Sequence, residues 1–301
     1  MAPRLSIVVI GFDMRRELPR TVTSLLPPYQ QGIRPGDVEI IVVDNGSSEP
    51  ICREWFPEDA AISVVRVDDG GVSPCRAINR GAALARADQL AIVIDGARMA
   101  SPGLIATALA ASSLHPDSFV ATLGFHLGPK VQQLSVTEGY TRGVEDELLR
   151  GIGWPHNGYR LFEICALGGS YVYGVLRVPP ETTFFVMKTA MFHAIGRYDE
   201  RFVQLGGGLA SFDFFRRAAE ASKDSFSMLV GEGTFHQLHY GATTREGGIS
   251  RPHKNGVSLG TIYMREYEQI VGRPFRMANQ TPLLFGRITH PDVPRLFFGS
   301  P

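Results

Sequence analysis

Acidic residues directly follow or close apolar runs at three places in the first hundred residues. Asp13 comes just after the run that ends at Ile10, Asp44 closes a second run, and Asp95-Gly96 closes a third. Carboxylate oxygens at such positions can bind a divalent cation or accept hydrogen bonds from a ligand. The carboxyl ends of parallel strands share one edge of an α/β sheet, and ligands bind along that edge. We therefore expect these residues to line one binding site.

The acids can meet only if strands and helices alternate along the chain. Continuous β-branched runs predict parallel strands covered on both faces, at residues 5–10, 38–44, 62–67 and 90–94. Helices are expected between them at 15–26 and 73–87. Farther along, the pattern predicts a strand at 182–187, a helix at 210–221, and a strand at 227–230 that gives way to a loop at 231–240. The predicted fold class is α/β, with a mostly parallel, Rossmann-like central sheet and helices on both faces.

The composition limits the class of protein. With 301 residues, of which 44% are hydrophobic and 20% charged, the chain can bury a sizeable core. Lys and Arg number 30, as do Asp and Glu, so no net charge favours nucleic acid as a partner. The cysteines lack metal-ligand spacing, and no apolar run approaches the roughly 20 residues of a transmembrane helix. A cytoplasmic protein with reduced thiols and no secretion signal is expected.

These segments, taken in order, resemble family 2 glycosyltransferases and their GT-A relatives. In the first half the resemblance is carried by residues 6–10, 39–47, 76–81 and 91–97. In the second half it is carried by residues 196–202, the glycines at 206–208, and Asp213. The match covers roughly residues 5–240. It implies one continuous GT-A domain, with a donor-binding half at 1–125 and an acceptor-binding and catalytic half, including a C-terminal tail, at 126–301.

The resemblance implies transfer of a sugar from a nucleoside diphosphate sugar to a hydroxyl of a carbohydrate or other acceptor, with inversion. It assigns Asp44 to the nucleobase, Asn79 to the ribose, and Asp95 to a Mn²⁺ or Mg²⁺ ion that bridges the diphosphate. Such an ion would neutralise the charge that develops as the bond between sugar and diphosphate breaks. The remaining residues expected on the donor side are Ile10, Asp13, Gly96 and Arg98.

The metal-binding Asp-x-Asp element of the family is incomplete here, because its third position is Ala97. Arg98 follows immediately. A histidine from elsewhere could complete the cation site with Asp95, or Arg98 could itself neutralise the diphosphate as a fixed cation. The third alternative is that donor chemistry has been lost.

The acceptor side departs from the family pattern too. Members commonly carry a Glu-Asp pair after the glycines, whereas this chain has Ala210-Ser211. Asp213 is the nearest remaining acid and is the predicted general base, and the other interpretation is a carboxylate that stabilises the start of a helix. Glu232 is the second candidate base, and its alternative is a solvent-exposed loop acid.

Two histidines, His236 and His239, lie three residues apart in a segment bounded by glycines. An extended backbone would point them to opposite faces, so both could not easily bind one ion. By resemblance, His239 is the predicted metal ligand beside Asp95, and His236 is predicted to make either a packing contact or a contact with the acceptor. The other acceptor contacts expected are His126, Gly207 and Gly208.

Two other functions stay open. A nucleotidyltransferase also combines an α/β sheet with acidic metal ligands, but it would carry a Gly-rich basic loop after its first strand, which residues 11–15 do not provide. A catalytically silent nucleotide-sugar-binding protein would keep the fold after losing the acids replaced by Ala97 and Ser211. Because function belongs to the site and not to the fold, a donor-hydrolysis assay separates this case from a transferase.

Overall fold

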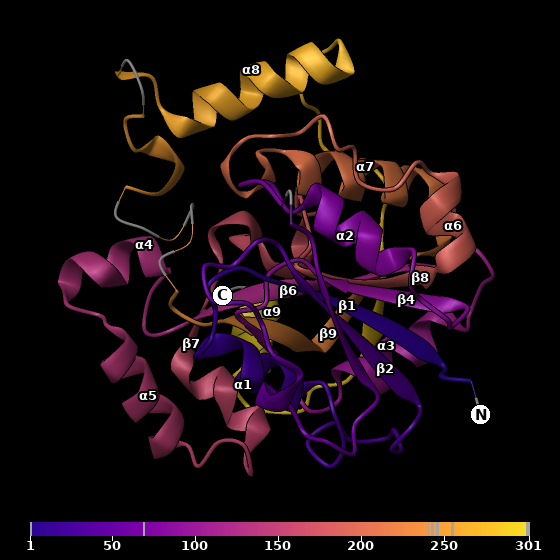
Figure 1. The fold of residues 1–301 in the computed structure, drawn as a ribbon, viewed down its shortest axis with the longest axis vertical. Helices are drawn as coiled ribbons and strands as arrows, with labels where there is room; N and C mark the ends of the chain where they lie inside the picture. Colours follow the sequence, from indigo (N-terminus) through magenta and orange to yellow (C-terminus); the bar gives the residue numbers. More distant parts are fainter. Residues whose placement is uncertain are drawn as a thin grey trace.

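The computed structural model describes residues 2–68, 70–239, 241, 244, 247–253 and 256–298. These residues form one ten-stranded sheet (Figure 1). Its main path runs β10-β9-β6-β8-β4-β1-β2-β3, with β5 paired to β9 and β7 paired to β6. The strands are β1 (Leu5–Gly11), β2 (Val38–Asp44), β3 (Ile62–Arg66), β4 (Gln89–Val93), β5 (Arg98–Ala100), β6 (Phe119–Leu127), β7 (Cys165–Leu167), β8 (Phe184–Lys188), β9 (Phe226–His236) and β10 (Leu283–Gly286).

Most neighbouring strands of the main path are parallel. β1, β2, β3 and β4 run in one direction, and β6, β9 and β10 are parallel to one another. β8 lies between β4 and β6 and is antiparallel to both, so all seven other strands of the path share one direction. The predicted mostly parallel α/β sheet is therefore confirmed. Because β8 is reversed, its amino end lies at the edge where β4 and β6 have their carboxyl ends.

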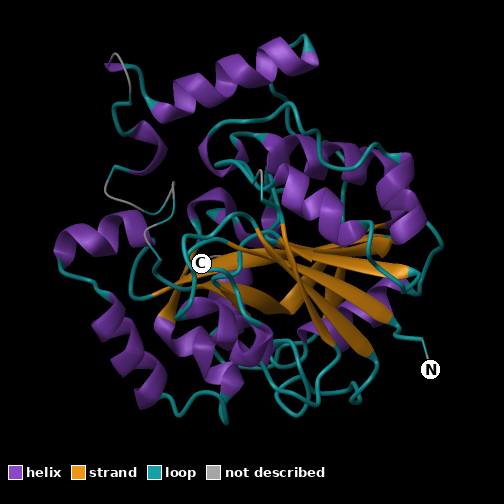
Figure 2. Cartoon of the chain, in the orientation of Figure 1, coloured by secondary structure: helices purple, strands orange, loops and turns teal. Residues whose placement is uncertain are grey.

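Helices cover both faces of this sheet (Figures 1 and 2). Alternate residues of β1 show why: Val8 packs in one core with residues of α2 and α7, whereas Val9 packs in the other with residues of α1 and α3. A strand buried on both faces needs a continuous apolar sequence, as β1 has. The helices are α1 (Glu17–Ser24), α2 (Cys75–Ala82), α3 (Leu104–Ser112), α4 (Gln132–Ser135), α5 (Arg142–Gly151), α6 (Thr189–Ala194), α7 (Ala210–Ser222), α8 (Leu259–Val271) and α9 (Val293–Phe298).

α2 is shorter than predicted and packs close to the sheet. A Cβ on Gly81 would lie 2.4 Å from a methyl carbon of Val8, so only glycine allows this approach. The helix predicted to reach residue 87 ends at Ala82. Beyond it, the backbone N–H of Arg86 donates to Glu39 at 2.9 Å, which ties the chain to β2 in place of a further helical turn.

β9 is longer than predicted. The strand expected to end at residue 230 continues to His236, so the loop predicted at 231–236 was wrong. Gly231 has a φ of +84°, and the pairing with β6 shifts register between Ala121 and Leu123. The glycines that suggested a loop instead accommodate an irregularity inside a strand. The tail after residue 281 also joins the sheet, because β10 pairs with β9.

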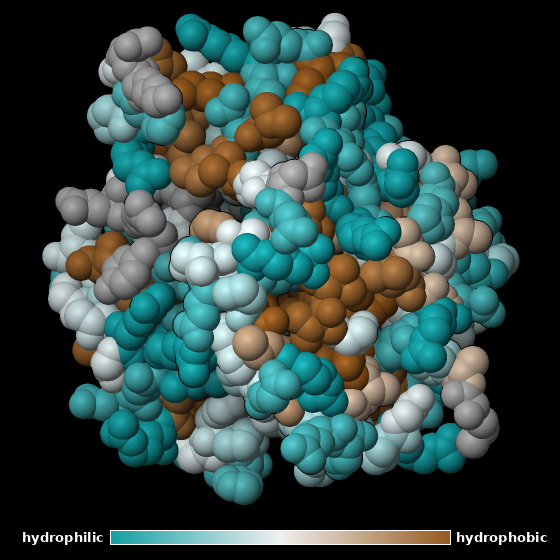
Figure 3. Space-filling model, viewed as in Figure 1, coloured by the Kyte–Doolittle hydropathy of each residue, from teal (hydrophilic) through white to brown (hydrophobic). Residues whose placement is uncertain are grey.

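Figure 3 shows polar residues over most of the face in view, with apolar residues gathered near its centre and near α8. Among the described helices, none combines the length and the apolar character needed to span a membrane. Cys52, Cys75 and Cys165 are free thiols.

Candidate functional site

The ends of β1, β2 and β4 form a row at one edge of the sheet. Asp44 pairs with Gly11 at the ends of β2 and β1. Gly96, just beyond β4, donates its backbone N–H to the Ile10 carbonyl at 2.7 Å. A Cβ on Gly96 would lie 2.7 Å from that same oxygen, so the close approach requires glycine. The structure thus brings Ile10, Asp44 and Gly96 to one edge.

The Asp44 carboxylate is buried and bound within the protein. It accepts backbone N–H bonds from Ser47 at 2.8 Å and Ile51 at 3.2 Å, and it pairs with Arg66 at 2.6 Å. Burial alone would raise its pKa, but the bonds from Ser47, Ile51 and Arg66 together hold the pKa below its usual value. Asp44 therefore holds the loop that follows β2.

Asp13 and Asn79 also have protein partners. Asp13 Oδ1 accepts the backbone N–H and the hydroxyl of Ser48 at 2.8 and 2.7 Å, which joins the loops after β1 and β2. The Asn79 amide donates to the Tyr198 carbonyl at 2.8 Å and to Glu200 at 2.9 Å, and its oxygen accepts the Tyr198 N–H at 3.1 Å. Asp13 therefore lies at the expected edge, whereas Asn79 joins α2 to the segment after α6.

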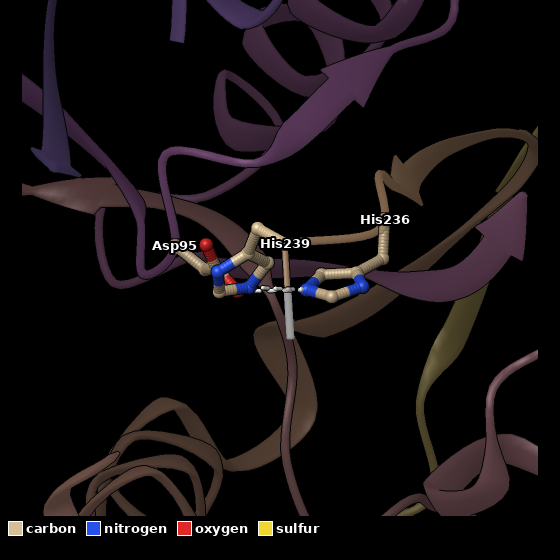
Figure 4. A group of neighbouring side chains, drawn as sticks. All are labelled: Asp95, His236 and His239. Carbon is tan, nitrogen blue, oxygen red and sulfur yellow. Dashed lines mark hydrogen bonds and ion pairs between the residues drawn. The ribbon is translucent and has the colours of Figure 1, made fainter. Parts of the chain in front are cut away.

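Asp95, His236 and His239 form a compact cluster (Figure 4). Asp95 Oδ2 lies 2.9 Å from His236 Nε2 and 3.3 Å from His239 Nε2, and the two imidazole nitrogens are 3.0 Å apart. Asp95 Oδ1 accepts the Ala97 N–H at 3.0 Å, which leaves Oδ2 for the histidines. The expectation that the histidines face opposite ways was wrong, because β9 ends at His236 and the chain is no longer a strand at His239.

Gln132 determines how His236 presents its ring. Its Nε2 donates to the His236 carbonyl at 2.8 Å, and its Oε1 lies 2.6 Å from His236 Nδ1. Because a carbonyl can only accept, the amide orientation is set, and Nδ1 must carry the proton that it donates to Oε1. Burial, followed by the charge of Arg98, lowers the pKa of His236 to about 4, so the ring is neutral at pH 7. Its Nε2 lone pair therefore faces the cluster.

This cluster needs a positive charge at its centre. A carboxylate oxygen and an imidazole lone pair are both acceptors, and they would repel each other at 2.9 Å without a proton or cation nearby. Burial opposes protonation of His239, but the neighbouring Asp95 carboxylate raises its pKa above the usual value. For Asp95, burial alone would raise the pKa, but the neighbouring His239 and His236 hold the pKa of this carboxyl well below its usual range. A proton on His239 or a divalent cation can supply the charge.

The donor set also fits a divalent cation. The three ligand atoms are 2.9, 3.0 and 3.3 Å apart. Neighbouring ligands of an octahedral ion with bonds of about 2.1 Å lie about 3.0 Å apart. His236 has, in Gln132, the outer partner that typically orients a metal-binding histidine. His236, predicted as an acceptor contact, thus lies with the predicted ligands Asp95 and His239.

Arg98 and His126 border the cluster. Arg98, on β5, pairs with His236 in antiparallel register, so the two side chains project to the same face. Its Nε is buried and has no hydrogen-bond partner among the described residues. The His126 ring centroid lies 5.4 Å from that of His236, and its Nδ1 accepts the Gln132 backbone N–H at 2.9 Å. Both residues, predicted separately, therefore meet at this site.

Asp213 is buried between two guanidinium groups. One carboxylate oxygen pairs with Arg216 at 3.0 Å and the other with Arg217 at 2.7 Å, and the side chain is 6% exposed. Arg217 in turn donates to the Ile195 carbonyl at 2.6 Å. Both carboxylate oxygens of Asp213 are therefore engaged in ion pairs with arginines of α7, and Arg217 in turn connects α7 to the segment after α6.

Glu232 is buried inside the sheet, which contradicts the interpretation as an exposed loop acid. It is 1% exposed and accepts bonds from the hydroxyls of Ser101 and Tyr159. Burial raises its pKa. It lies four residues before His236 on β9, which corresponds to about 13 Å along an extended strand. It is therefore remote from the cluster.

Gly207 and Gly208 lie in a loop between the start of α2 and α8. A Cβ on Gly207 would lie 3.0 Å from the Pro74 ring, and one on Gly208 would lie 2.6 Å from Glu266 Oε2. In the described part of the chain, no hydrogen bond or ion pair links this loop to Asp95.

Gln132 was not predicted from the sequence. It lies in the weakly periodic stretch at 128–158, where no local motif marks a site residue. Its partner His236 is 104 residues away along the chain. Only the connection from β6 to α4 places it beside the histidine.

Comparisons with known proteins agree with this fold. The structure of S. aureus TarS 1-349 in complex with UDP superimposes with a TM-score of 0.53 at 13% identity, over 79% of this chain and 61% of that chain. The structure of S. aureus TarS 1-349 in complex with UDP-GlcNAc gives a TM-score of 0.51 at 13% identity, over 80% of this chain and 60% of that one. The chain thus matches less than two thirds of the length of these structures. No curated protein matches its sequence.

The family relationship comes from the sequence of the first half. Residues 6–125 match the family described as "Glycosyl transferase family 2". This range contains β1 to β4, the row of strand ends and Asp95. The first half of the chain, residues 6–125, is therefore similar to glycosyl transferase family 2, and the whole sheet has the GT-A fold seen in the two TarS structures.

Proposed function

We propose that this chain is a glycosyltransferase that takes a sugar from a nucleoside diphosphate sugar and transfers it, with inversion, to a hydroxyl of a carbohydrate or other acceptor. The observation that carries the proposal is the cluster of Asp95, His236 and His239 at the carboxyl edge of the sheet. The family match over residues 6–125 supports the reaction class. The UDP and UDP-GlcNAc complexes of TarS support a uridine diphosphate sugar as the donor to test first.

Asp95 Oδ2, His236 Nε2 and His239 Nε2 would hold a Mn²⁺ or Mg²⁺ ion. When bound, such an ion neutralises the diphosphate as it leaves. Arg98, which projects to the same face as His236, adds a fixed positive charge beside the diphosphate. This assignment combines the two alternatives considered for the incomplete Asp-x-Asp element.

The nucleoside would lie along the ends of β1 and β2. Ile10 and Asp13 border this row of strand ends. Asp44 would contribute to nucleobase binding indirectly, because it holds the loop after β2 in place. The acceptor would enter from the side of His126, so residues 1–125 would bind most of the donor and residues 126–301 the acceptor.

Binding of UDP with and without Mn²⁺, together with hydrolysis of UDP-GlcNAc, tests the proposal. A ligand at 100 times its dissociation constant stabilises the folded state by about 2.7 kcal/mol, which a thermal melt detects. His239→Ala should lose the Mn²⁺-dependent part of UDP binding, whereas the control His115→Ala, at an exposed position, should keep it.

The outcomes separate the alternatives. Binding of UDP without hydrolysis or transfer from any nucleoside diphosphate sugar would favour the silent binding protein. Full activity in excess chelator would show that no divalent cation is needed, and Arg98 would then be the group that neutralises the diphosphate.

A further inference from the structure

The proposed transfer needs a carboxylate that takes the proton of the acceptor hydroxyl. The oxygens of Asp213 are paired with two arginines, and Glu232 is buried away from the cluster. The geometry points to Glu181 as the general base, an inference that rests on the proposed glycosyltransferase function.

Glu181 lies just before β8, the reversed strand of the sheet. The Ile94 N–H donates to the Thr183 carbonyl at 3.4 Å, so the antiparallel pairing of β4 and β8 extends beyond the end of β4. Glu181 lies two residues before Thr183, in the segment that leads into β8. The reversed strand thus delivers an acid to the edge that carries Asp95.

The two oxygens of Glu181 have different surroundings. Oε1 accepts the Ser170 hydroxyl at 2.6 Å. Oε2 has no hydrogen bond or ion pair with any described residue, and it is not sealed from solvent in this partly exposed side chain. One oxygen is therefore anchored while the other can receive a proton.

The charge environment suits a base. Burial raises the pKa of Glu181, and the bond from Ser170 and the charge of Arg98 offset this only in part. A raised pKa brings a carboxyl closer to the working pH of a general base.

Tyr198 connects Glu181 electrostatically with the position where the family resemblance places the base. The charge of Glu181 acts on the Tyr198 phenol, which interacts as well with the Ser211 side chain. Ser211 stands where family members commonly carry the catalytic Asp. Glu181 thus interacts electrostatically with Arg98 and with Tyr198. A carboxylate from the segment before β8 would replace the one missing from the start of α7.

In the transfer, Glu181 Oε2 accepts the proton of the acceptor hydroxyl while the acceptor oxygen forms a bond to the anomeric carbon. The bond from that carbon to the diphosphate oxygen breaks, and its electron pair leaves with the nucleoside diphosphate. Glu181 then releases the proton to solvent.

Hydrolysis of UDP-GlcNAc, with water as acceptor, tests this assignment. Glu181→Gln should lower kcat by about 10²–10⁴-fold, with Mn²⁺-dependent affinity for UDP unchanged. Glu268→Gln is the matched control, because Glu268 is exposed on α8, and its rate should equal that of the wild type. Azide carries no proton to remove, so it should restore turnover of Glu181→Gln by forming a glycosyl azide.

The assignment is overturned if Glu181→Gln hydrolyses UDP-GlcNAc at the wild-type rate. It is also overturned if the variant binds UDP but hydrolyses slowly and azide does not restore its turnover. If Glu181→Gln fails to fold, Glu181→Asp replaces it. A lower kcat at unchanged UDP affinity supports the assignment, and an unchanged kcat overturns it. A wild-type protein that binds UDP but neither hydrolyses nor transfers any nucleoside diphosphate sugar overturns the proposed function, and this assignment with it.

Discussion

Gln132 shows how one uncharged side chain can control a charged site. Its amide binds both the ring and the backbone of His236, and its own backbone N–H binds His126. The side chain is fully buried, so water does not compete for these bonds. One residue of α4 therefore sets the ring orientation of a ligand on β9.

Replacing Gln132 with Leu should lower the affinity for Mn²⁺ by about 10–100-fold, the usual cost of losing an outer partner of a metal-binding histidine. The His236 ring would then lose the bond that selects its tautomer. Gln133→Leu is the matched control, because Gln133 follows on the same helix and its Oε1 has no described partner. Calorimetry with Mn²⁺ alone measures the difference. Equal affinities in the two variants would show that Gln132 does not position His236.

The end of β2 is held by a buried acid. Asp44 closes β2 and binds two backbone N–H groups of the following loop, together with Arg66. Its neighbour Asp68 also pairs with Arg66, at 3.1 Å, but from an exposed position. The two acids thus share a partner and differ in burial.

We expect Asp44→Asn to lower the free energy of unfolding by about 2 kcal/mol at pH 7, because hydrogen bonds to a charged group are lost. The folded pKa of Asp44 is depressed below 3.8, so its contribution is present above that pH and disappears as the pH falls through the folded pKa. The gap between wild type and Asp44→Asn should therefore narrow below about pH 3.8 in urea unfolding curves. Asp68→Asn should stay close to wild type throughout. A gap for Asp44→Asn that is constant with pH would refute the electrostatic explanation.

On the scale of the whole molecule, the two halves of the chain share one sheet. β8, from the second half, lies between β4 and β6. β6 itself spans the boundary at residue 125, and it pairs with both β8 and β9. Residues 1–125 and 126–301 are therefore structurally interleaved.

Residues 1–125 expressed alone should lack a cooperative thermal transition, because β4 would lose β8 and β6 would lose both of its long neighbours. Unpaired strand edges with buried apolar faces lead to aggregation. Circular dichroism melts and size-exclusion chromatography of the fragment and the full chain provide the comparison. A monomeric fragment with a sharp transition would mean that the first half folds independently.

The sequence by itself determined the first four parallel strands and the row of acids at their ends. Continuous runs of apolar, β-branched residues indicate strands that are buried on both faces of a sheet. The carboxyl ends of such parallel strands meet at one edge. It also singled out Asp95, Arg98, His126, His236 and His239, which the structure brings to one site.

Only the tertiary structure decided how those residues face one another. The convergence of His236 and His239 depends on the point where β9 ends, and the placement of Glu181 depends on the reversal of β8. The orientation of His236 depends on Gln132, whose partner is 104 residues away. Strand direction, strand end and long-range pairing follow from which segments pack together, and local periodicity carries no information about that choice.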